Sequence, residues 1–405
     1  MAKDLALSAE KNINASRKIL ESIYRLSKKH QTRAFLVGGP VRDLCRSKPK
    51  NLRSIQDLDI AVENHHAEIG QELAQKLRAR IIRYAQFMTL TLHLPDQTHL
   101  DIAQTRKETY ARPAILPKVE PAAINEDLYR RDFTINAMAM EITKNRPYLM
   151  LDPFFGQRDL KQKLIRVLHK KSFIDDPTRI FRSVRFATRF NFEIEKQTRS
   201  LLKTAVKNNY LRLLSAERVL YELQMIMPEP KSKAILKKLQ KSGIIKNLYG
   251  TNLPIKFFSE HGLLPAEKKL THFFAYLPYA KWLKYPLKKE IAQSAQAIQQ
   301  FAEPRRKLAK ANKPSHVYKT LKLMPGPALE ILSQIEPKPI KNKIKLYLGK
   351  YSKVKIFTTG KTLQSLGFAP GKNFSQILQT LLYSKLDGKI KNKNDEKKYL
   401  KNIRT

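Results

Sequence analysis

Val37-Gly38-Gly39-Pro40-Val41-Arg42-Asp43 is the stretch that decides the fold, together with Gln56-Asp57-Leu58-Asp59-Ile60 one loop later. The apolar run at 34–37 predicts a short buried strand, and the glycine pair after it allows a tight turn whose N–H groups can face an anion. A helix is expected to begin at the end of this turn. The second stretch has a period of two, so Asp57 and Asp59 are predicted to project from one face of a strand.

The two aspartates have the chemistry of a magnesium site. Mg²⁺ prefers oxygen ligands and is commonly held by one or two carboxylates together with substrate phosphates. A pair of such ions can activate the attacking and the leaving oxygen of an in-line phosphoryl displacement. Taken alone, a Gly-Gly pair indicates only a turn, and an Asp-x-Asp only a solvated strand edge. Their order favours a nucleotide-transfer site in which Asp57 and Asp59 are catalytic and bind Mg²⁺.

The composition is strongly basic, with 78 Lys and Arg against 35 Asp and Glu and a net charge of +43. Such a charge attracts polyanions, and RNA or DNA is the leading candidate. Because the sequence is also rich in Ile and Asn, a general composition bias can account for part of the lysine content, so the charge supports nucleic-acid binding without proving it. Cys45 is the only cysteine, which excludes an intramolecular disulfide and fits a reducing compartment. No apolar run approaches membrane-spanning length and the first residues lack a signal-peptide core, so no membrane contact and a cytoplasmic location are expected.

The order of the patterns indicates an α+β protein in which a mixed sheet with helices comes first and helices follow. Strand and helix patterns alternate up to about residue 150, and helical periodicity dominates from about residue 155. Proline-containing breaks near 227–230, 303–306 and 336–339 indicate boundaries. We therefore expect a catalytic head at 1–150, a helical neck at 151–227, a helical body at 228–303 and a helical tail at 304–405.

Two further clusters lie in the predicted head. Asp101 ends a strand-like run that could lie beside the aspartate strand, where it would supply a third catalytic carboxylate; the alternative is a structural pairing with an arginine such as Arg106.

The segment 127–139 places charged side chains in an apolar run. Arginine can contact phosphates with two N–H groups, and Asp and Asn can hold ribose hydroxyls, which makes nucleotide binding the functional interpretation; the alternative is a network that joins the sheet to the next helix. The residues concerned are Arg130, Arg131, Asp132 and Asn136.

A third cluster opens the predicted neck. The run 174–182 predicts a helix start with Asp176 at the N-cap and Pro177 in the first turn, and capping alone would explain its aspartates. However, Asp176 and Arg179 are three residues apart and can sit together at the helix end. They would then present acceptors and donors to the edge of a nucleobase. Arg182 continues a basic face of this helix and is expected to be a further nucleotide-binding residue.

In this order, the motifs resemble the class II tRNA nucleotidyltransferase and bacterial poly(A) polymerase family over about residues 30–225. The resemblance implies a head like that of DNA-polymerase-β-type nucleotidyltransferases, followed by an all-α neck, body and tail. It implies Mg²⁺ on Asp57 and Asp59 and a hinge at 152–156. It also implies three groups of nucleotide-binding residues. The triphosphate is expected to bind to Gly38, Gly39, Arg42 and Asp43. The ribose and phosphates are expected to bind to Arg130, Arg131, Asp132 and Asn136, and the base to Asp175, Asp176 and Arg179. Glu217, Arg218 and Glu222 match a following helical motif of structural character.

The chain departs from the family pattern at three places. Asp175 replaces the commoner glutamate, Phe155 stands where a second glycine is frequent, and Cys45-Arg46-Ser47 replaces Leu-Leu-Gly. The segment 106–117 resembles the flexible loop that the family needs for ATP, which disfavours an enzyme that adds only C.

The resemblance implies an enzyme that adds CMP and AMP from CTP and ATP to the tRNA 3′ end, builds or repairs CCA, and releases pyrophosphate. The basic helical parts would bind the tRNA acceptor arm. Three alternatives stay open. They are an A-adding enzyme beside a separate CC-adding enzyme, a poly(A) polymerase, and a non-catalytic RNA-binding protein on a transferase head.

Overall fold

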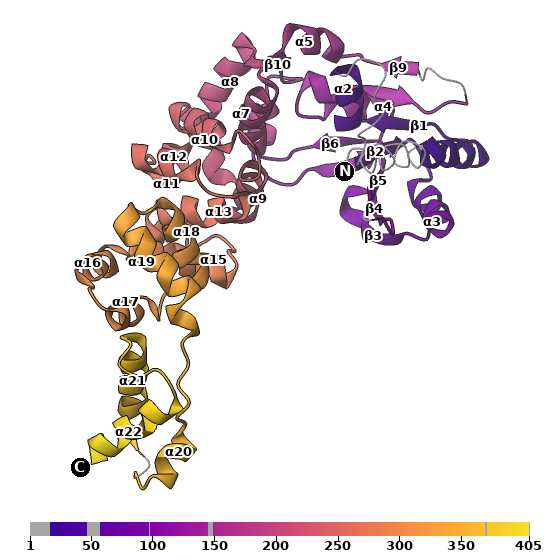
Figure 1. Ribbon diagram of the computed structural model, residues 1–405. Helices are drawn as coiled ribbons and strands as arrows, with labels where there is room; N and C mark the ends of the chain where they lie inside the picture. The colour runs from indigo at the N-terminus through magenta and orange to yellow at the C-terminus, as the bar shows by residue number, and fades with distance from the viewer. Residues whose placement is uncertain (1–16, 47–56, 97, 145–148, 369–370, 405) are drawn as a thin grey trace. The chain divides into compact units, whose positions relative to one another are not determined.

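The strand predicted before Gly38 forms as β1 (Ala34–Val37) in the computed structural model, which describes residues 17–46, 57–96, 98–144, 149–368 and 371–404 (Figure 1). It belongs to a seven-stranded sheet with the order β3-β4-β5-β2-β1-β8-β9. β2 and β5 run parallel and the other neighbours antiparallel, so the predicted mixed sheet is confirmed. The other strands are β2 (Asp57–Val62), β3 (Arg80–Tyr84), β4 (Thr89–His93), β5 (His99–Gln104), β8 (Ala139–Glu141) and β9 (Leu149–Leu151).

Helices pack on both faces of this sheet. On one face, α4 (Ile124–Tyr129) contributes Ile124 and Leu128 to a core with Phe35 and Ala61. On the other face, α3 (His66–Leu77) brings Gly70 against Leu90, so closely that no Cβ would fit. The period of two and the strand register place Asp59 of β2 and Asp101 of β5 on the α4 face. The segment after α4 therefore begins beside them.

Two smaller elements complete the head. α2 (Gly39–Arg46) follows the glycine turn at once, as predicted. Residues 47–56, which include Ser47 and Gln56 of the sequence motifs, lie outside the described residues. β6 (Arg106–Thr109) and β7 (Lys118–Pro121) pair as an antiparallel ribbon separate from the main sheet. The segment expected to be a flexible loop is thus a ribbon with a connection at 110–117.

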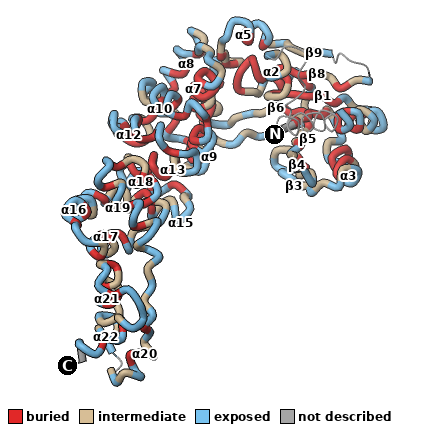
Figure 2. Tube along the Cα trace, viewed as in Figure 1, coloured by how far each residue is buried: buried red, intermediate tan, exposed pale blue. Residues whose placement is uncertain are grey.

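The chain beyond the head is mainly helical, as predicted, and its helices contain both buried and exposed residues (Figure 2). A two-stranded parallel pairing of β10 (Leu164–Ile165) with β11 (Glu193–Ile194) was not anticipated, because two-residue strands leave no periodicity. The helices of this region are α5 (Gly156–Gln162), α6 (Ser172–Asp175), α7 (Thr178–Phe190), α8 (Lys196–Lys207), α9 (Ala216–Ile226), α10 (Ser232–Lys241) and α11 (Ile244–Tyr249).

The start of α7 differs from the prediction by one or two residues. The helix begins at Thr178, with Pro177 rather than Asp176 in the N-cap position. Asp176 nevertheless accepts the backbone N–H of Thr178 at 3.0 Å through Oδ1. Its carboxylate thus pairs with an N–H at the helix start that has no partner within the helix, from one residue before the N-cap position.

The remaining helices pack around separate apolar cores. One core runs from Phe301 to Tyr347, and a second joins Leu363, Leu381 and Leu400. Pro304 lies in the first turn of α16, where proline is tolerated, so the predicted break at 303–306 does not interrupt a helix. The elements are α12 (Ile255–His261), α13 (Ala266–Ala275), α14 (Tyr279–Trp282), α15 (Lys289–Gln299), α16 (Ala302–Lys310), α17 (Pro314–Leu321), α18 (Gly326–Ile335), α19 (Lys338–Gly349), α20 (Gly360–Ser365), α21 (Lys372–Leu386) and α22 (Lys393–Arg404).

The chain forms two compact units. One comprises Met1–Glu222 with Ala234–Leu248, and the other Leu223–Lys233 with Tyr249–Thr405. The four-part division into head, neck, body and tail stays a prediction. Among the helices described, none combines the length and apolar character that a membrane crossing requires.

Candidate active site

The carboxylates of β2 and β5 lie side by side. Asp59 is the register partner of Asp101 on the neighbouring parallel strand, which confirms the predicted adjacency of the two strands. Asp101 accepts a 2.6 Å hydrogen bond from the Thr91 hydroxyl, whereas Arg106 contacts Glu108 and the Phe87 carbonyl. The structural pairing of Asp101 with Arg106 is therefore not formed. Asp57 opens β2 beside His99, and its side chain lies outside the described part.

These carboxylates suit an ion that binds together with substrate. Within the described side chains, no three His, Cys, Asp or Glu residues are grouped so that they could hold a metal ion by themselves. Mg²⁺ needs only one or two protein carboxylates when phosphates and water complete its shell. Asp59 and Asp101 on adjacent strands offer such hard oxygen ligands, so the donor set fits Mg²⁺.

The glycine turn reaches this point from the neighbouring strand. Gly38 has a φ of +70°, and a Cβ at this position would lie 2.9 Å from Arg131 Nη1 and 3.4 Å from Asp59 Oδ2. Glycine is therefore required both by the backbone conformation and by the close approach of the two side chains. The turn, one arginine of segment 127–139 and one metal-ligand candidate meet at a single place, which is the arrangement that a triphosphate with its metal needs.

A chain of charged hydrogen bonds connects this turn with helix α7. Buried Arg42 donates to Asn136 Oδ1 at 2.8 Å, and Asn136 donates to Asp132 Oδ1 at 2.9 Å. Asp132 Oδ2 accepts two bonds from Arg182 of α7, at 2.8 and 2.6 Å. Arg42 also pairs with Asp43 at 2.7 Å. Burial acts to raise the pKa of Asp132, but the charge of Arg182 and the hydrogen bonds outweigh it, so this pKa is below its ordinary value.

The adjacent arginines 130 and 131 differ in their surroundings. Arg130 pairs with Asp127 at 2.7 Å and with Glu108 of β6 at 2.9 Å, and Arg131 pairs with Asp127 at 2.9 Å. Arg130 therefore joins α4 to the β6–β7 ribbon, while Arg131 also reaches the glycine turn. The sequence analysis gave no role to Asp127 or Glu108. The partners of Asp127 follow from helical spacing, since Arg130 and Arg131 come three and four residues after it, whereas the pairing of Glu108 with Arg130 depends on how the ribbon docks on α4.

The predicted base-reading pair lies at one helix end. Arg179 is almost fully buried and donates to Ser172 Oγ at 2.7 Å and to the Arg130 carbonyl at 2.6 Å. Its Nε is 3.9 Å from Asp176 Oδ2. The contact with the Arg130 carbonyl connects this pair with the head.

Asp175 lies apart from these bonds. Its Oδ2 is 3.9 Å from His169 Nδ1, and burial raises the pKa of Asp175. Burial, with the charges of Arg179 and Lys171, lowers the pKa of His169 to about 4, so the imidazole is neutral near pH 7. Asp175, which is one methylene shorter than the glutamate common at this position, therefore faces the neutral imidazole of His169.

A comparison with known proteins gives the family. Residues 34–166 match the "Poly A polymerase head domain" and residues 191–250 the "Probable RNA and SrmB-binding site of polymerase A". An A-adding tRNA nucleotidyltransferase of Halalkalibacterium halodurans is 30% identical over 389 residues, which is 93% of this chain and 90% of the relative. The chain belongs to the tRNA nucleotidyltransferase family.

Two further members of the tRNA nucleotidyltransferase family extend the comparison. An A-adding enzyme of Aquifex aeolicus is 35% identical over 80% of this chain, which spans only 41% of that relative's length. A solved complex of a CCA-adding enzyme with ATP is similar in structure, with a TM-score of 0.78 and 28% sequence identity. The match covers 99% of this chain and 98% of the chain in that structure. The α+β fold with a nucleotidyltransferase head is thus confirmed.

The departure of Phe155 from the family pattern has a conformational explanation. Phe155 has a φ of +60°, in the left-handed region that favours glycine, and it is 60% exposed. Asp152 caps the following helix α5, since its Oδ1 accepts the N–H of Gly156 at 2.6 Å and its Oδ2 that of Gln157 at 3.0 Å. Phe155 thus adopts a conformation that glycine adopts at lower cost, directly before the helix that Asp152 caps.

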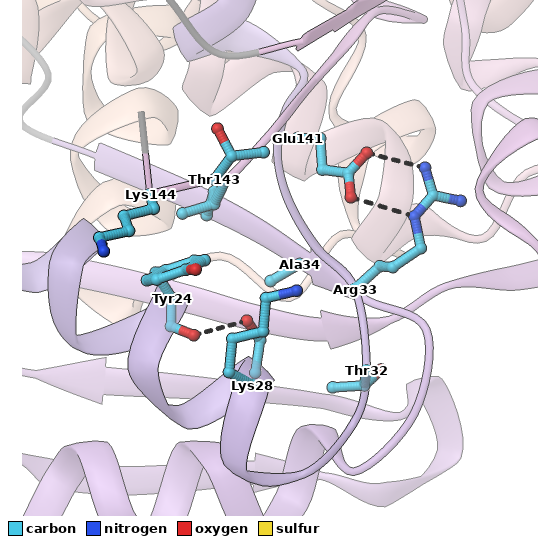
Figure 3. Close-up of a pocket in the computed structure, with 10 residues that line it drawn as sticks. Tyr24, Lys28, Thr32, Arg33, Ala34, Glu141, Thr143 and Lys144 are labelled. Atoms are coloured by element: carbon cyan, nitrogen blue, oxygen red, sulfur yellow. Dashed lines mark hydrogen bonds and ion pairs between the residues drawn. The ribbon is translucent and has the colours of Figure 1, made fainter. Parts of the chain in front are cut away.

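A cavity of the head lies away from these residues. It has a volume of about 320 Å³ and is lined by Tyr24 and Lys28 of the first described helix, Arg33 before β1, and Glu141 and Lys144 (Figure 3). Arg33 and Glu141 lie together at one side of it and are joined by hydrogen bonds of 3.2 and 2.9 Å (Figure 3). Because it lies at the start of β1 and Gly38 follows the strand's end, we do not assign it to the active site.

Proposed function

We propose that this chain adds CMP and AMP, from CTP and ATP, to the 3′ end of tRNA. The observation that carries the proposal is the meeting of Gly38, Asp59 and Arg131 in the same compact unit that holds Asp176 and Arg179. The first group suits a triphosphate and its metal, and the second suits a base edge. In the reaction, the tRNA 3′ oxygen bonds to the α-phosphorus of the nucleotide, the bond from this phosphorus to the bridging oxygen breaks, and pyrophosphate leaves.

The side chains divide this work. Asp57 and Asp59 would hold Mg²⁺, with Asp101 beside them, and the bound ion would stabilise charge on the reacting oxygens. The N–H groups of the Gly38–Gly39 turn and the Arg131 guanidinium would orient the triphosphate. Asp176 would accept from the amino group of the base and Arg179 would donate to the adjacent ring nitrogen. Adenine and cytosine share this acceptor and donor pattern, whereas guanine and uracil do not.

A second candidate is addition of AMP alone, beside a separate CC-adding enzyme. The relatives from Halalkalibacterium halodurans and Aquifex aeolicus, both named A-adding, favour it. The likeness to a CCA-adding enzyme over nearly the whole chain favours CMP and AMP addition. AMP transfer is common to both candidates, and CMP transfer separates them. In either case we place the reaction in the cytoplasm, where tRNA and nucleoside triphosphates are available.

Three tRNA transcripts decide between the candidates. They end before CCA, after the first C and after CC, and each is incubated with Mg²⁺ and with CTP or ATP. Extension of the first two with CTP and of the third with ATP supports CCA synthesis. Extension of only the third, with ATP alone, supports A addition. If no transcript is extended, both proposals are wrong.

The metal assignment predicts the effect of Asp59→Asn. Loss of one ligand charge should lower kcat/KM for AMP transfer at least about 1,000-fold, because metal stabilisation of the transition state is removed. The tRNA dissociation constant, measured by filter binding, should stay within about twofold because phosphate contacts dominate RNA affinity. Glu68→Gln replaces an exposed acid on α3 and should leave both quantities unchanged. Retained activity in Asp59→Asn would contradict the assignment.

A further inference from the structure

Arg218 of α9 contacts the carboxylate that we propose to read the base. Its Nη2 is 2.6 Å from Asp176 Oδ1, which also accepts from the Thr178 N–H at 3.0 Å and the Thr178 hydroxyl at 2.6 Å. Three donors thus converge on one oxygen. Oδ2 faces Arg179 Nε at 3.9 Å, which is too long for a hydrogen bond. The donors on Oδ1 therefore fix the side chain so that Oδ2 is the oxygen left for another donor.

The second arm of the same guanidinium holds the ribbon of the head. Arg218 Nη1 donates to the Ala114 carbonyl at 2.8 Å. Ala114 lies in the connection between β6 and β7, is 8% exposed, and has a φ of +63°. A non-glycine residue in this conformation is strained and needs surrounding contacts to persist. The bond from Arg218 is such a contact.

We infer that Arg218 is a positioning residue for base selection, because one guanidinium fixes both the Asp176 carboxylate and the β6–β7 connection. The inference rests on the proposed function and adds a residue to its base-reading site. A planar fork can serve two acceptors in different directions, whereas the single ammonium of lysine cannot hold both in the same geometry. Arg218 therefore joins three segments that are far apart in sequence, at 114, 176 and 218.

The test compares wild type, Arg218→Gln and Arg218→Lys in AMP transfer to a tRNA transcript ending in CC. We expect the ratio of kcat/KM for ATP over GTP to fall about tenfold in Arg218→Gln, since loss of a charged hydrogen bond frees the carboxylate to turn toward guanine's donor N–H. Arg218→Lys should give an intermediate ratio. Hydrogen exchange of the amides at 110–117 should become faster in both variants.

Arg212→Gln is the matched control. Arg212 is another arginine that donates to a backbone carbonyl, that of Asn247 at 2.9 Å, and it is not among the donors to Asp176 described above. This variant should keep the wild-type ratio and the wild-type exchange at 110–117. If Arg218→Gln does not fold, as judged by its thermal transition, Arg218→Lys carries the test.

The outcomes separate this inference from the proposed function. If wild type extends no tRNA, the proposed function fails. If wild type adds AMP and both Arg218 variants keep the wild-type ratio of kcat/KM for ATP over GTP, the inference is overturned. This includes the case in which kcat falls equally for both nucleotides, because such a result indicates a purely structural role of Arg218.

Discussion

At the scale of single residues, Gly38 shows how one backbone conformation serves the site. Its φ of +70° lets the chain turn directly after β1, and the missing side chain leaves room for Arg131 and Asp59. The left-handed conformation costs an L-residue about 1–2 kcal/mol. A side chain here would therefore act on stability and on the triphosphate contact together.

Gly38→Ala tests this double requirement. We expect the free energy of unfolding to fall by about 1–2 kcal/mol, measured by urea denaturation. The KM for ATP should rise because the new methyl group displaces Arg131 Nη1. Gly39→Ala is the control for stability, since its Cβ would meet only Arg42 Nη2 at 3.6 Å and needs no positive φ. Equal losses in the two variants would count against the conformational argument.

At the scale of elements, the packing of α5 on the head depends on Gly156. A Cβ here would collide with the Thr134 carbonyl and would lie 2.8 Å from Met138 Cγ. Backbone cannot move aside as a flexible side chain can, so Gly156→Ala should lower the free energy of unfolding by about 1–3 kcal/mol in a denaturant titration. Gly326→Ala at the start of α18 is the control, because nothing lies within 4 Å of its Cβ. An unchanged Gly156→Ala protein would contradict the close packing.

Helix α12 carries a buried histidine that should make stability depend on pH. His261 is fully buried, and neither ring nitrogen has a hydrogen-bond partner among the described residues. Burial, with the charges of His272, Lys269 and Lys233, lowers the pKa of His261 from 6.5 to about 3. Between these values the unfolded chain takes up a proton that the folded chain does not. The stability that depends on neutral His261 is therefore fully present above pH 6.5 and is lost as the pH falls below this value.

His261→Leu should remove this loss. From pH 6.5 to 5, wild type should lose about 2 kcal/mol more of its free energy of unfolding than the variant. Urea denaturation at both pH values measures the difference. His316→Leu replaces an exposed histidine on α17 and should follow wild type at both pH values. If His261→Leu shows the wild-type pH dependence, the buried neutral state of His261 is wrong.

At the scale of the whole molecule, the net charge of +43 should govern tRNA affinity. Binding to phosphates releases counterions, so affinity falls as salt rises. We expect the tRNA dissociation constant to rise at least about tenfold between 50 and 200 mM KCl, measured by filter binding. The KM for ATP at saturating tRNA should change much less. A salt-independent tRNA affinity would contradict binding through the basic surface.

Much of the head could be predicted from sequence because its signals are local. β1, the turn at Gly38, β2 and β5 follow from apolar runs, glycine and a period of two, and their order indicates the α+β class. One feature could not be predicted in this way, because the β10–β11 pairing is too short to leave a period. The boundary predicted near 303–306 lies at the start of α16, shortly after the end of α15, since proline also begins helices.

The sequence by itself determined which chemical groups this protein carries, because carboxylates two residues apart, a glycine pair and an Asp-x-x-Arg spacing are local patterns. Only the tertiary structure decided which of them meet. Arg131 reaches Gly38 and Asp59, while Arg130 is paired with Asp127 and Glu108. Arg218 reaches Asp176 and Ala114, a contact between segments more than 40 residues apart. Such contacts depend on how the ribbon, α4 and the neck helices pack, which no short window of sequence records.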